Sequence, residues 1–104
     1  MTVIGFLSVS PVREGSLSNE VAKAVAALED FDVVYETTAM GTIIEAEDVH
    51  ELLSAVGAAH EAADGDRVST FLKIDDKRTS TESAAAKVES VAEELGREPS
   101  GGAE

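Results

Sequence analysis

The chain has 104 residues, which suits one domain with a single hydrophobic core. It carries 21 Asp and Glu against 8 Lys and Arg, a formal net charge of −13, so we expect no binding to nucleic acid or to an anionic membrane. It has no cysteine, which excludes disulfides and cysteine-based metal sites or nucleophiles. Hydrophobic residues make up 43% of the chain at regular spacings, which indicates a folded protein with a halophilic type of acidic surface rather than disorder.

The longest apolar runs, such as VIGFLSV from residue 3, are too short to span a bilayer. The first residues lead directly into this run, without the basic region and cleavage site of a secretory signal. We therefore expect a cytoplasmic protein.

The first predicted strand covers Val3–Pro11, because apolar side chains alternate along it and Pro11 cannot donate to a further ladder bond. An amphipathic helix follows, with Ser16 or Ser18 as its cap and its end near Asp30.

Two further strands are predicted at Phe31–Thr38 and Thr42–Ala46, and the short turn between them, through Gly41, favours a hairpin. A second helix is predicted to begin at Glu47 or Asp48, where a carboxylate is favourable near the positive end of the helix. Its expected buried stripe consists of seven residues: Val49, Leu52, Leu53, Val56, Ala59, His60 and Ala63.

A fourth strand is predicted at Val68–Arg78 and a third helix at Thr81–Leu95. Residues 1–96 are expected to form one domain, and residues 97–104, with Pro, Gly and charge, a mobile tail.

The order βαββαβ plus a terminal helix predicts an α+β protein, a ferredoxin-like antiparallel sheet with an extra C-terminal helix. We expect the first and fourth strands to be neighbours in the centre and both crossover helices to cover one face. The open face would carry Phe6 and Phe71, with Ile4, Ile43 or Tyr35 nearby. We expect the sheet or the third helix of a second copy to cover this apolar face.

The segment AMGTIIEA, from residue 39, holds the most interesting polar groups. Glu45 lies among apolar residues, and it either points to solvent or accepts a hydrogen bond from a cationic or amino-bearing ligand. Thr42 is expected on the same face as Met40, which is either core filler or a soft surface against a heteroaromatic ring. Gly41 either meets a turn requirement or lets a ligand approach the backbone.

Other polar residues carry no catalytic or metal pattern. His50 and His60 lack the spacing of paired helical metal ligands, so no metal is expected. Ser8, Ser10 and Ser18 have no His–Asp pair placed to activate them, so no nucleophile is expected. The charged run of residues 75–78 is either a solvated strand end or a buttress at the mouth of a pocket, through Asp75 and Arg78.

Three segments in this order resemble the YkoF-like thiamine-binding family, whose signature is close to PMGT-x-IEG and later IKIDDR. The resemblance covers roughly Val3 to Val91 and departs from the family at Ala39, Ala46 and Lys77, where Pro, Gly and Arg are usual. The residues that carry it are Ser8, Pro11, Ser18, Met40, Gly41, Thr42, Ile44, Glu45, His60, Arg67, Lys73, Ile74, Asp75, Asp76 and Arg78.

The resemblance implies a homodimer or homotetramer that binds thiamine or its hydroxymethylpyrimidine part, as a carrier or sensor rather than an enzyme, with no cofactor. The residues expected to bind the ligand are Phe6, Ser8, Ser10, Ser18, Met40, Thr42 and Glu45.

Two alternatives stand beside this reading. The protein is a regulatory or assembly module whose open sheet serves only self-association, or it is a small enzyme that uses Glu45 as a general base at a subunit interface. If the protein is a thiamine carrier or sensor, Glu45→Ala is expected to weaken ligand binding with little loss of stability.

Overall fold

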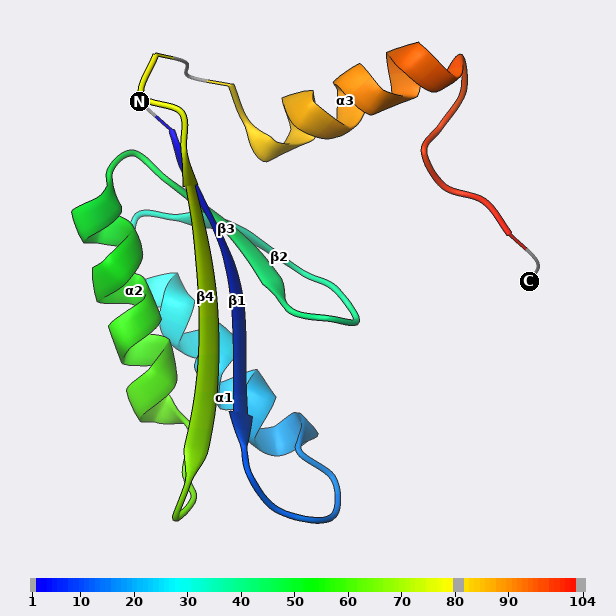
Figure 1. Ribbon diagram of the computed structural model, residues 1–104. Helices are drawn as coiled ribbons and strands as arrows, with labels where there is room; N and C mark the ends of the chain where they lie inside the picture. The colour runs from blue at the N-terminus through cyan, green and yellow to red at the C-terminus, as the bar shows by residue number, and fades with distance from the viewer. Residues whose placement is uncertain (1, 80–81, 103–104) are drawn as a thin grey trace.

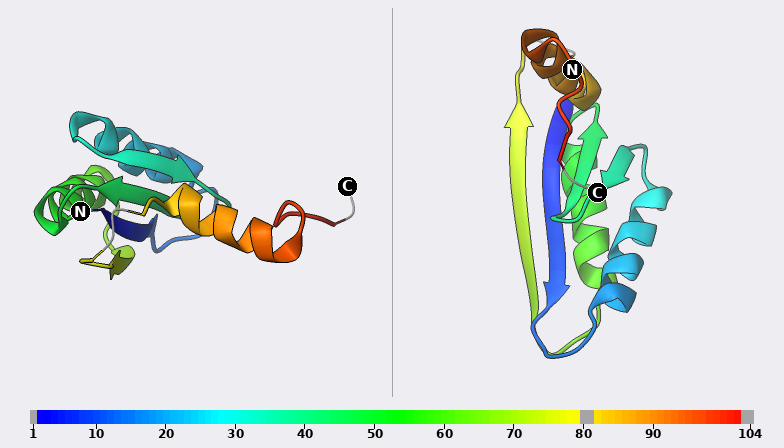
Figure 2. Two further views of the ribbon diagram at one scale, coloured as in Figure 1. Left: turned by 90° about the horizontal axis from the view of Figure 1, so that it is seen from above. Right: turned by 90° about the vertical axis from the view of Figure 1, so that its right-hand side faces the viewer.

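The computed structural model describes residues 2–79 and 82–102. It contains a four-stranded antiparallel sheet with two helices packed on one face (Figures 1 and 2). The elements are β1 Val3–Pro11, α1 Ser18–Ala27, the 3₁₀ turn Leu28–Asp30, β2 Val34–Thr37, β3 Thr42–Ala46, α2 Val49–Ala62, β4 Val68–Asp76 and α3 Ala84–Leu95. This arrangement confirms the predicted ferredoxin-like α+β fold with an extra C-terminal helix.

The strand order is β2-β3-β1-β4, so β1 and β3 are central and β4 is an edge strand. Gly5 of β1 lies opposite Ile44 of β3 on one side and Ile74 of β4 on the other. The prediction that the first and fourth strands are neighbours is confirmed, but the central position given to the fourth strand is wrong. The β2–β3 hairpin occupies one edge of β1, which leaves β4 only the other edge.

The hydrophobic core lies between the sheet and its two covering helices. Its largest fully buried side chains are Val3, Leu28, Ile44 and Leu52. Leu52 approaches β1 closely because Gly5 has no side chain: a Cβ at Gly5 would lie 2.9 Å from the Leu52 Cδ1 atom. Alternating buried and half-buried residues along β1 follow the pleat of the strand.

The helix starts were predicted with mixed success. Asp48 caps α2, its carboxylate accepting a hydrogen bond from the Glu51 N–H at 2.8 Å, as predicted. The predicted serine cap of α1 is wrong: Leu17 occupies the capping position without a side-chain bond. The hydroxyls of Ser16 and Ser18 bond each other instead, at 3.0 Å.

The buried face of α2 is narrower than predicted. Leu52, Val56 and Ala59 are buried, whereas Leu53 and His60 are exposed, contrary to expectation. Each residue turns the helix by about 100°, so Leu53 points well away from the core that Leu52 enters. The exposed His60 ring forms a hydrogen bond with the Thr70 hydroxyl.

The predicted hairpin is confirmed, with a hydrogen bond of 2.8 Å from the Thr38 N–H to the Gly41 carbonyl. The strand β2 is shorter than the predicted Phe31–Thr38, because its pairing begins where Val34 meets Glu45 of the short β3. The residues just before it, Phe31 and Val33, pack against the core instead.

The open face of the sheet carries Ile4, Phe6, Ile43 and Phe71, as predicted. Phe6 and Phe71 meet edge to face, with ring centroids 6.4 Å apart. Tyr35 was wrongly expected near this face. It pairs with Ile44 on the helix-covered side, because strand alternation places the two residues together there.

The helix α3 lies beyond one end of the sheet, away from the core (Figures 1 and 2). It begins after the capping residue Ser83, while Thr81, its predicted start, lies outside the described residues. Gly96, with φ of 73°, ends the helix. The domain boundary expected after residue 96 stays a prediction, and Ala103 and Glu104 also lie outside the described residues. Across the described part of the chain, no helix has the length and apolar character needed to cross a membrane.

Candidate functional site

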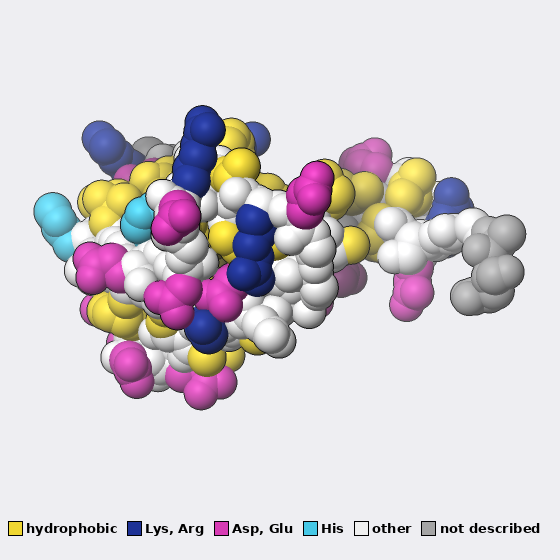
Figure 3. All heavy atoms as spheres, turned by 90° about the horizontal axis from the view of Figure 1, so that it is seen from below, with side chains coloured by type: hydrophobic (Ala, Val, Ile, Leu, Met, Phe, Trp, Pro, Cys, Tyr) yellow, Lys and Arg dark blue, Asp and Glu magenta, His cyan; other side chains and the backbone are white. Residues whose placement is uncertain are grey.

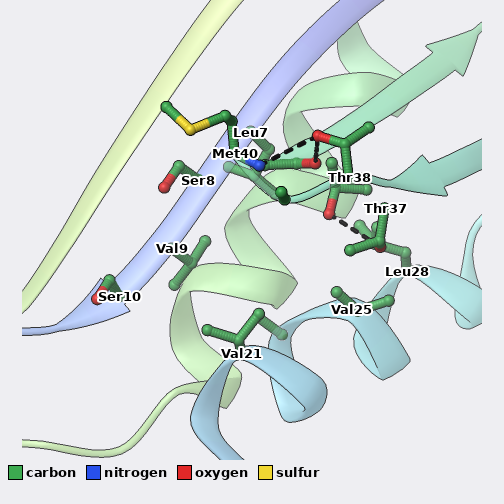
Figure 4. Close-up of a pocket in the computed structure, with 14 residues that line it drawn as sticks. Leu7, Ser8, Val9, Ser10, Val21, Val25, Leu28, Thr37, Thr38 and Met40 are labelled. Carbon is green, nitrogen blue, oxygen red and sulfur yellow. Dashed lines mark hydrogen bonds between the residues drawn. The ribbon is translucent and has the colours of Figure 1, made fainter. Parts of the chain in front are cut away.

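A cavity of about 160 Å³ lies between β1, the β2–β3 hairpin and α1 (Figure 4). Apolar side chains from β1 and α1 form most of its wall, and threonines from the hairpin add hydroxyl groups. No ionisable side chain is among its 14 lining residues, which are Leu7, Ser8, Val9, Ser10, Val21, Ala24, Val25, Leu28, Thr37, Thr38, Ala39, Met40, Gly41 and Thr42.

The cavity exists because the two central strands differ in length. β1 pairs with β3 only as far as Leu7 opposite Thr42, whereas β1 itself continues to Pro11. Beside this last part of β1 the hairpin turn takes the place of a paired strand. Val21 and Val25 of α1 close the hollow from the helix side (Figure 4).

The peptide edge of β1 is available in this hollow. The Leu7 carbonyl faces the hairpin, because a Cβ at Gly41 would lie 2.7 Å from its oxygen. Peptide groups two residues apart in a strand point to the same side, so Val9 also directs its N–H and C=O toward the cavity. These groups provide one donor and one acceptor close together.

Two threonines form a hydroxyl pair at the hairpin end of the cavity. The Thr37 and Thr42 side-chain oxygens are 3.1 Å apart, and Thr42 is only 5% exposed. Either hydroxyl can donate or accept, so the pair can present either character to a ligand. Sequence reasoning missed Thr37, although the hairpin register that pairs it with Thr42 was a signal for it.

The hairpin turn is fixed by its own polar groups. The Thr38 hydroxyl donates to the Gly41 carbonyl at 2.9 Å and accepts from the Met40 N–H at 3.3 Å. Gly41 has no left-handed φ, so its backbone conformation does not demand glycine. A close approach to β1 demands it instead, because any Cβ would collide with the Leu7 carbonyl and the Phe6 ring.

Four of the predicted ligand-binding residues, Ser8, Ser10, Met40 and Thr42, line the cavity. Thr42 is buried in the cavity wall, whereas the serines lie at the rim, since they alternate with the buried Leu7 and Val9 (Figure 4). Met40 is 80% exposed at the tip of the turn.

The other three predicted residues, Phe6, Ser18 and Glu45, do not line the cavity. Thr42 and Glu45 were expected to share one hollow, and this is wrong, because residues three apart in a strand point to opposite faces. On the open face, a Glu45 oxygen accepts a hydrogen bond from the Ala84 N–H at 2.8 Å, at the start of α3. Ser18 lies in a shallow groove between α1 and β2.

A buried carboxylate fixes the helix that forms one cavity wall. Glu20 of α1 accepts hydrogen bonds from the Asp64 N–H at 2.7 Å and from the Lys23 ammonium. These two bonds, in that order, hold the pKa of Glu20 below its ordinary value. The Glu20 bonds tie α1 to the turn between α2 and β4.

The surface around this region is charged: Asp and Glu side chains lie among Lys and Arg side chains on the face shown in Figure 3.

The charged end of β4 lies away from the cavity. Asp75 pairs with Ile4, near the start of β1, whereas the cavity lies near its end. A Lys87 ammonium 2.9 Å from the Asp75 carboxylate lowers the pKa of Asp75 and has its own pKa raised. Arg78 pairs with Asp76 at 3.4 Å. Of the two interpretations of this charged run, the buttress at the mouth of this cavity is therefore wrong, and Asp75 pairs with Lys87 near the start of α3.

Among residues 2–79 and 82–102, no three His, Asp or Glu side chains come together as a metal site.

The antiparallel sheet, its two covering helices and the uncharged cavity define an α+β protein of the ferredoxin-like class. Residues 6–92 match the family described as thiamine-binding protein, and the chain belongs to that family.

Named relatives agree with this assignment. A UPF0045 protein from Methanothermobacter thermautotrophicus is 54% identical over 77% of this chain and 84% of its own length. The crystal structure of a 35% identical protein, MJ1052 from Methanocaldococcus jannaschii, has a TM-score of 0.81 and covers 88% of this chain and 97% of that chain. A Thermotoga maritima structure with 22% identity and a TM-score of 0.72, over 88% of this chain and 99% of that one, shows the shared fold alone.

Proposed function

We propose that this protein binds thiamine or a related hydroxymethylpyrimidine compound in the cavity between β1, α1 and the β2–β3 hairpin, as a cytoplasmic carrier or sensor without catalysis. Membership of the thiamine-binding family supports the class of ligand. The observation that carries the placement is the lining of the cavity, which is apolar with a few hydroxyl and peptide groups.

The size of the cavity favours one ring of the ligand. Its volume of about 160 Å³ is below the range of roughly 300–1,000 Å³ typical of sites for drug-sized molecules. The pyrimidine is uncharged, whereas the thiazolium carries a fixed positive charge, and no ionisable side chain lines the cavity. The pyrimidine therefore occupies the cavity, and the thiazolium remains at its mouth.

The polar groups fit an aminopyrimidine edge, which offers an amino donor next to a ring acceptor. The peptide of Val9 offers a matching acceptor and donor, and the Thr42 hydroxyl, oriented by Thr37, supplies a further partner. The faces of the pyrimidine ring would contact Val21 and Val25, and burial of these apolar surfaces would favour binding without a charged side chain.

Calorimetry tests this proposal with thiamine, its phosphate esters and free hydroxymethylpyrimidine, in concentrated salt to suit the acidic surface. Thr42→Val removes the hydroxyl at nearly constant volume and should weaken binding about tenfold. Thr70→Val, the same change on the edge strand β4, is the matched control and should leave the affinity unchanged. Absence of heat with every one of these ligands would refute the proposal.

Self-association as a homodimer or homotetramer is a further part of the proposal. Exposed apolar side chains support it: Phe71 on the open face is 59% exposed, and Val88 and Val91 on α3 are 55% and 51% exposed. The same observation favours a second candidate function, an assembly module that binds no thiamine. Sedimentation showing an oligomer, together with calorimetry showing no ligand binding, would select this second function.

A further inference from the structure

The hairpin turn that forms one wall of the cavity lies directly against β1 at Gly41. A Cβ at this position would lie 2.7 Å from the Leu7 carbonyl oxygen and 2.7 Å from the Phe6 Cζ atom. Carbon atoms that are not bonded do not approach backbone oxygen so closely. The turn therefore lies closer to β1 than a residue with a Cβ atom at position 41 would allow.

The opposite side of the same turn faces the cavity. The Gly41 carbonyl accepts hydrogen bonds from both the N–H and the hydroxyl of Thr38. The next residue, Thr42, carries the hydroxyl that pairs with Thr37. The position of Gly41 therefore determines where the polar wall of the cavity lies.

Phe6 supports this turn from the open face of the sheet. Its side chain is half-buried and is not among the residues that line the cavity. The two groups that lie against Gly41 are the Leu7 carbonyl and the Phe6 ring. The Leu7 carbonyl is fixed within the paired strand β1, whereas the Phe6 ring can be removed by substitution. Its removal would leave space into which the turn can move.

We propose that Phe6 is a positioning residue, which sets the width of the cavity through the contact of its ring with the turn at Gly41, without touching the ligand. The effect on affinity rests on the proposed ligand binding, whereas the effect on the turn does not. Sequence reasoning placed Phe6 among the residues that bind the ligand directly, and the geometry points to this indirect role instead.

The experiment compares Phe6→Ala with Phe71→Ala. Phe71→Ala is the matched control, because Phe71 belongs to the same aromatic pair on the same face but is not among the atoms closest to Gly41. Two quantities are measured: amide hydrogen exchange at Thr38 by NMR, and calorimetric affinity for hydroxymethylpyrimidine.

In Phe6→Ala we expect Thr38 exchange to become roughly tenfold faster, because the turn opens more often. We expect the affinity to fall about tenfold as well, with both changes absent in Phe71→Ala. Unchanged Thr38 exchange in Phe6→Ala, or an equal change in Phe71→Ala, would overturn the proposal. If no variant and not even the unmodified protein binds the pyrimidine while exchange changes as expected, the proposed function fails and the positioning role stands.

Discussion

The helix-covered face of the sheet and the helix α3 are stabilised in different ways. On the covered face, Val3, Leu28, Ile44 and Leu52 are fully buried between the sheet and α1 and α2. No residue of α3 is buried, and its apolar residues Val88, Val91 and Leu95 are about half exposed. Packing therefore holds the covered side, whereas α3 is held by its capping groups, by the hydrogen bond from the Ala84 N–H to Glu45 and by the ion pair of Lys87 with Asp75.

This difference separates the two possible roles of the chain. The cavity lies in the packed region, where neighbouring side chains are fixed, as a ligand site requires. The α3 helix and the open face leave apolar side chains uncovered, as expected of surfaces that meet another chain. Four substitutions test this division, and the first of them should cost the most stability.

Leu52→Ala should cause the largest loss of stability, about 2–5 kcal/mol, because it leaves a cavity against β1 at Gly5. Urea unfolding at fixed salt and protein concentration measures it. The matched control is Leu53→Ala on the same helix, where the side chain is 47% exposed, and its cost should be well below that of Leu52→Ala. Equal costs would contradict the packing described for α2.

Glu45→Ala should loosen the start of α3 and leave ligand affinity unchanged. The carboxylate accepts the Ala84 N–H, so its loss should speed exchange of that amide roughly fivefold, the size of a lost helix cap. Glu47→Ala, at a nearby exposed residue, should leave this exchange unchanged. A marked loss of ligand affinity in Glu45→Ala would show that Glu45 takes part in ligand binding.

Glu20→Gln should change how stability depends on pH. Hydrogen bonds in the folded state lower the pKa of Glu20. The ionised Glu20 carboxylate therefore stabilises the fold fully when the pH is above the ordinary pKa of 4.5, and this stabilisation is lost as the pH falls below that value. The difference in unfolding free energy between the unmodified protein and Glu20→Gln should therefore be largest at neutral pH and shrink in acid. Glu14→Gln, which removes the same charge from an exposed loop, should show a smaller difference at neutral pH.

Val91→Ser should have the smallest effect on a single protomer, within about 0.5 kcal/mol, because Val91 is 51% exposed. Unfolding at low protein concentration measures this value. Under the proposed self-association, sedimentation of Val91→Ser should show a weaker oligomer. A large loss of stability in the isolated protomer would show that α3 packs against its own chain.

The sequence predicts those parts of the fold that depend on local pattern. Alternation marks β1, and Asp48 marks the start of α2, so both were predicted correctly. The cap of α1 was missed, because two neighbouring serines bond each other, a choice that local propensity does not determine. The edge position of β4 depends on which strand pairs with each edge of β1, and the pattern within one segment does not determine this pairing.

The candidate site was predicted only in part. Thr42 was expected near a pocket, and it lines one. Strand alternation already separates Thr42 from Glu45, but their closeness in one short motif favoured a shared site. Val21, Val25 and Thr37 enter the cavity through packing between elements, so spacing within one segment does not indicate them.

An NMR titration of the labelled protein with free hydroxymethylpyrimidine shows whether the ligand enters the cavity between β1, α1 and the β2–β3 hairpin. We expect saturable shifts of the Val9, Thr37 and Thr42 amides, together with the methyl groups of Val21 and Val25, and little change at Ala84 on the open face. Shifts centred on Ala84 and Glu45, or no saturable shift at the cavity residues, would contradict it.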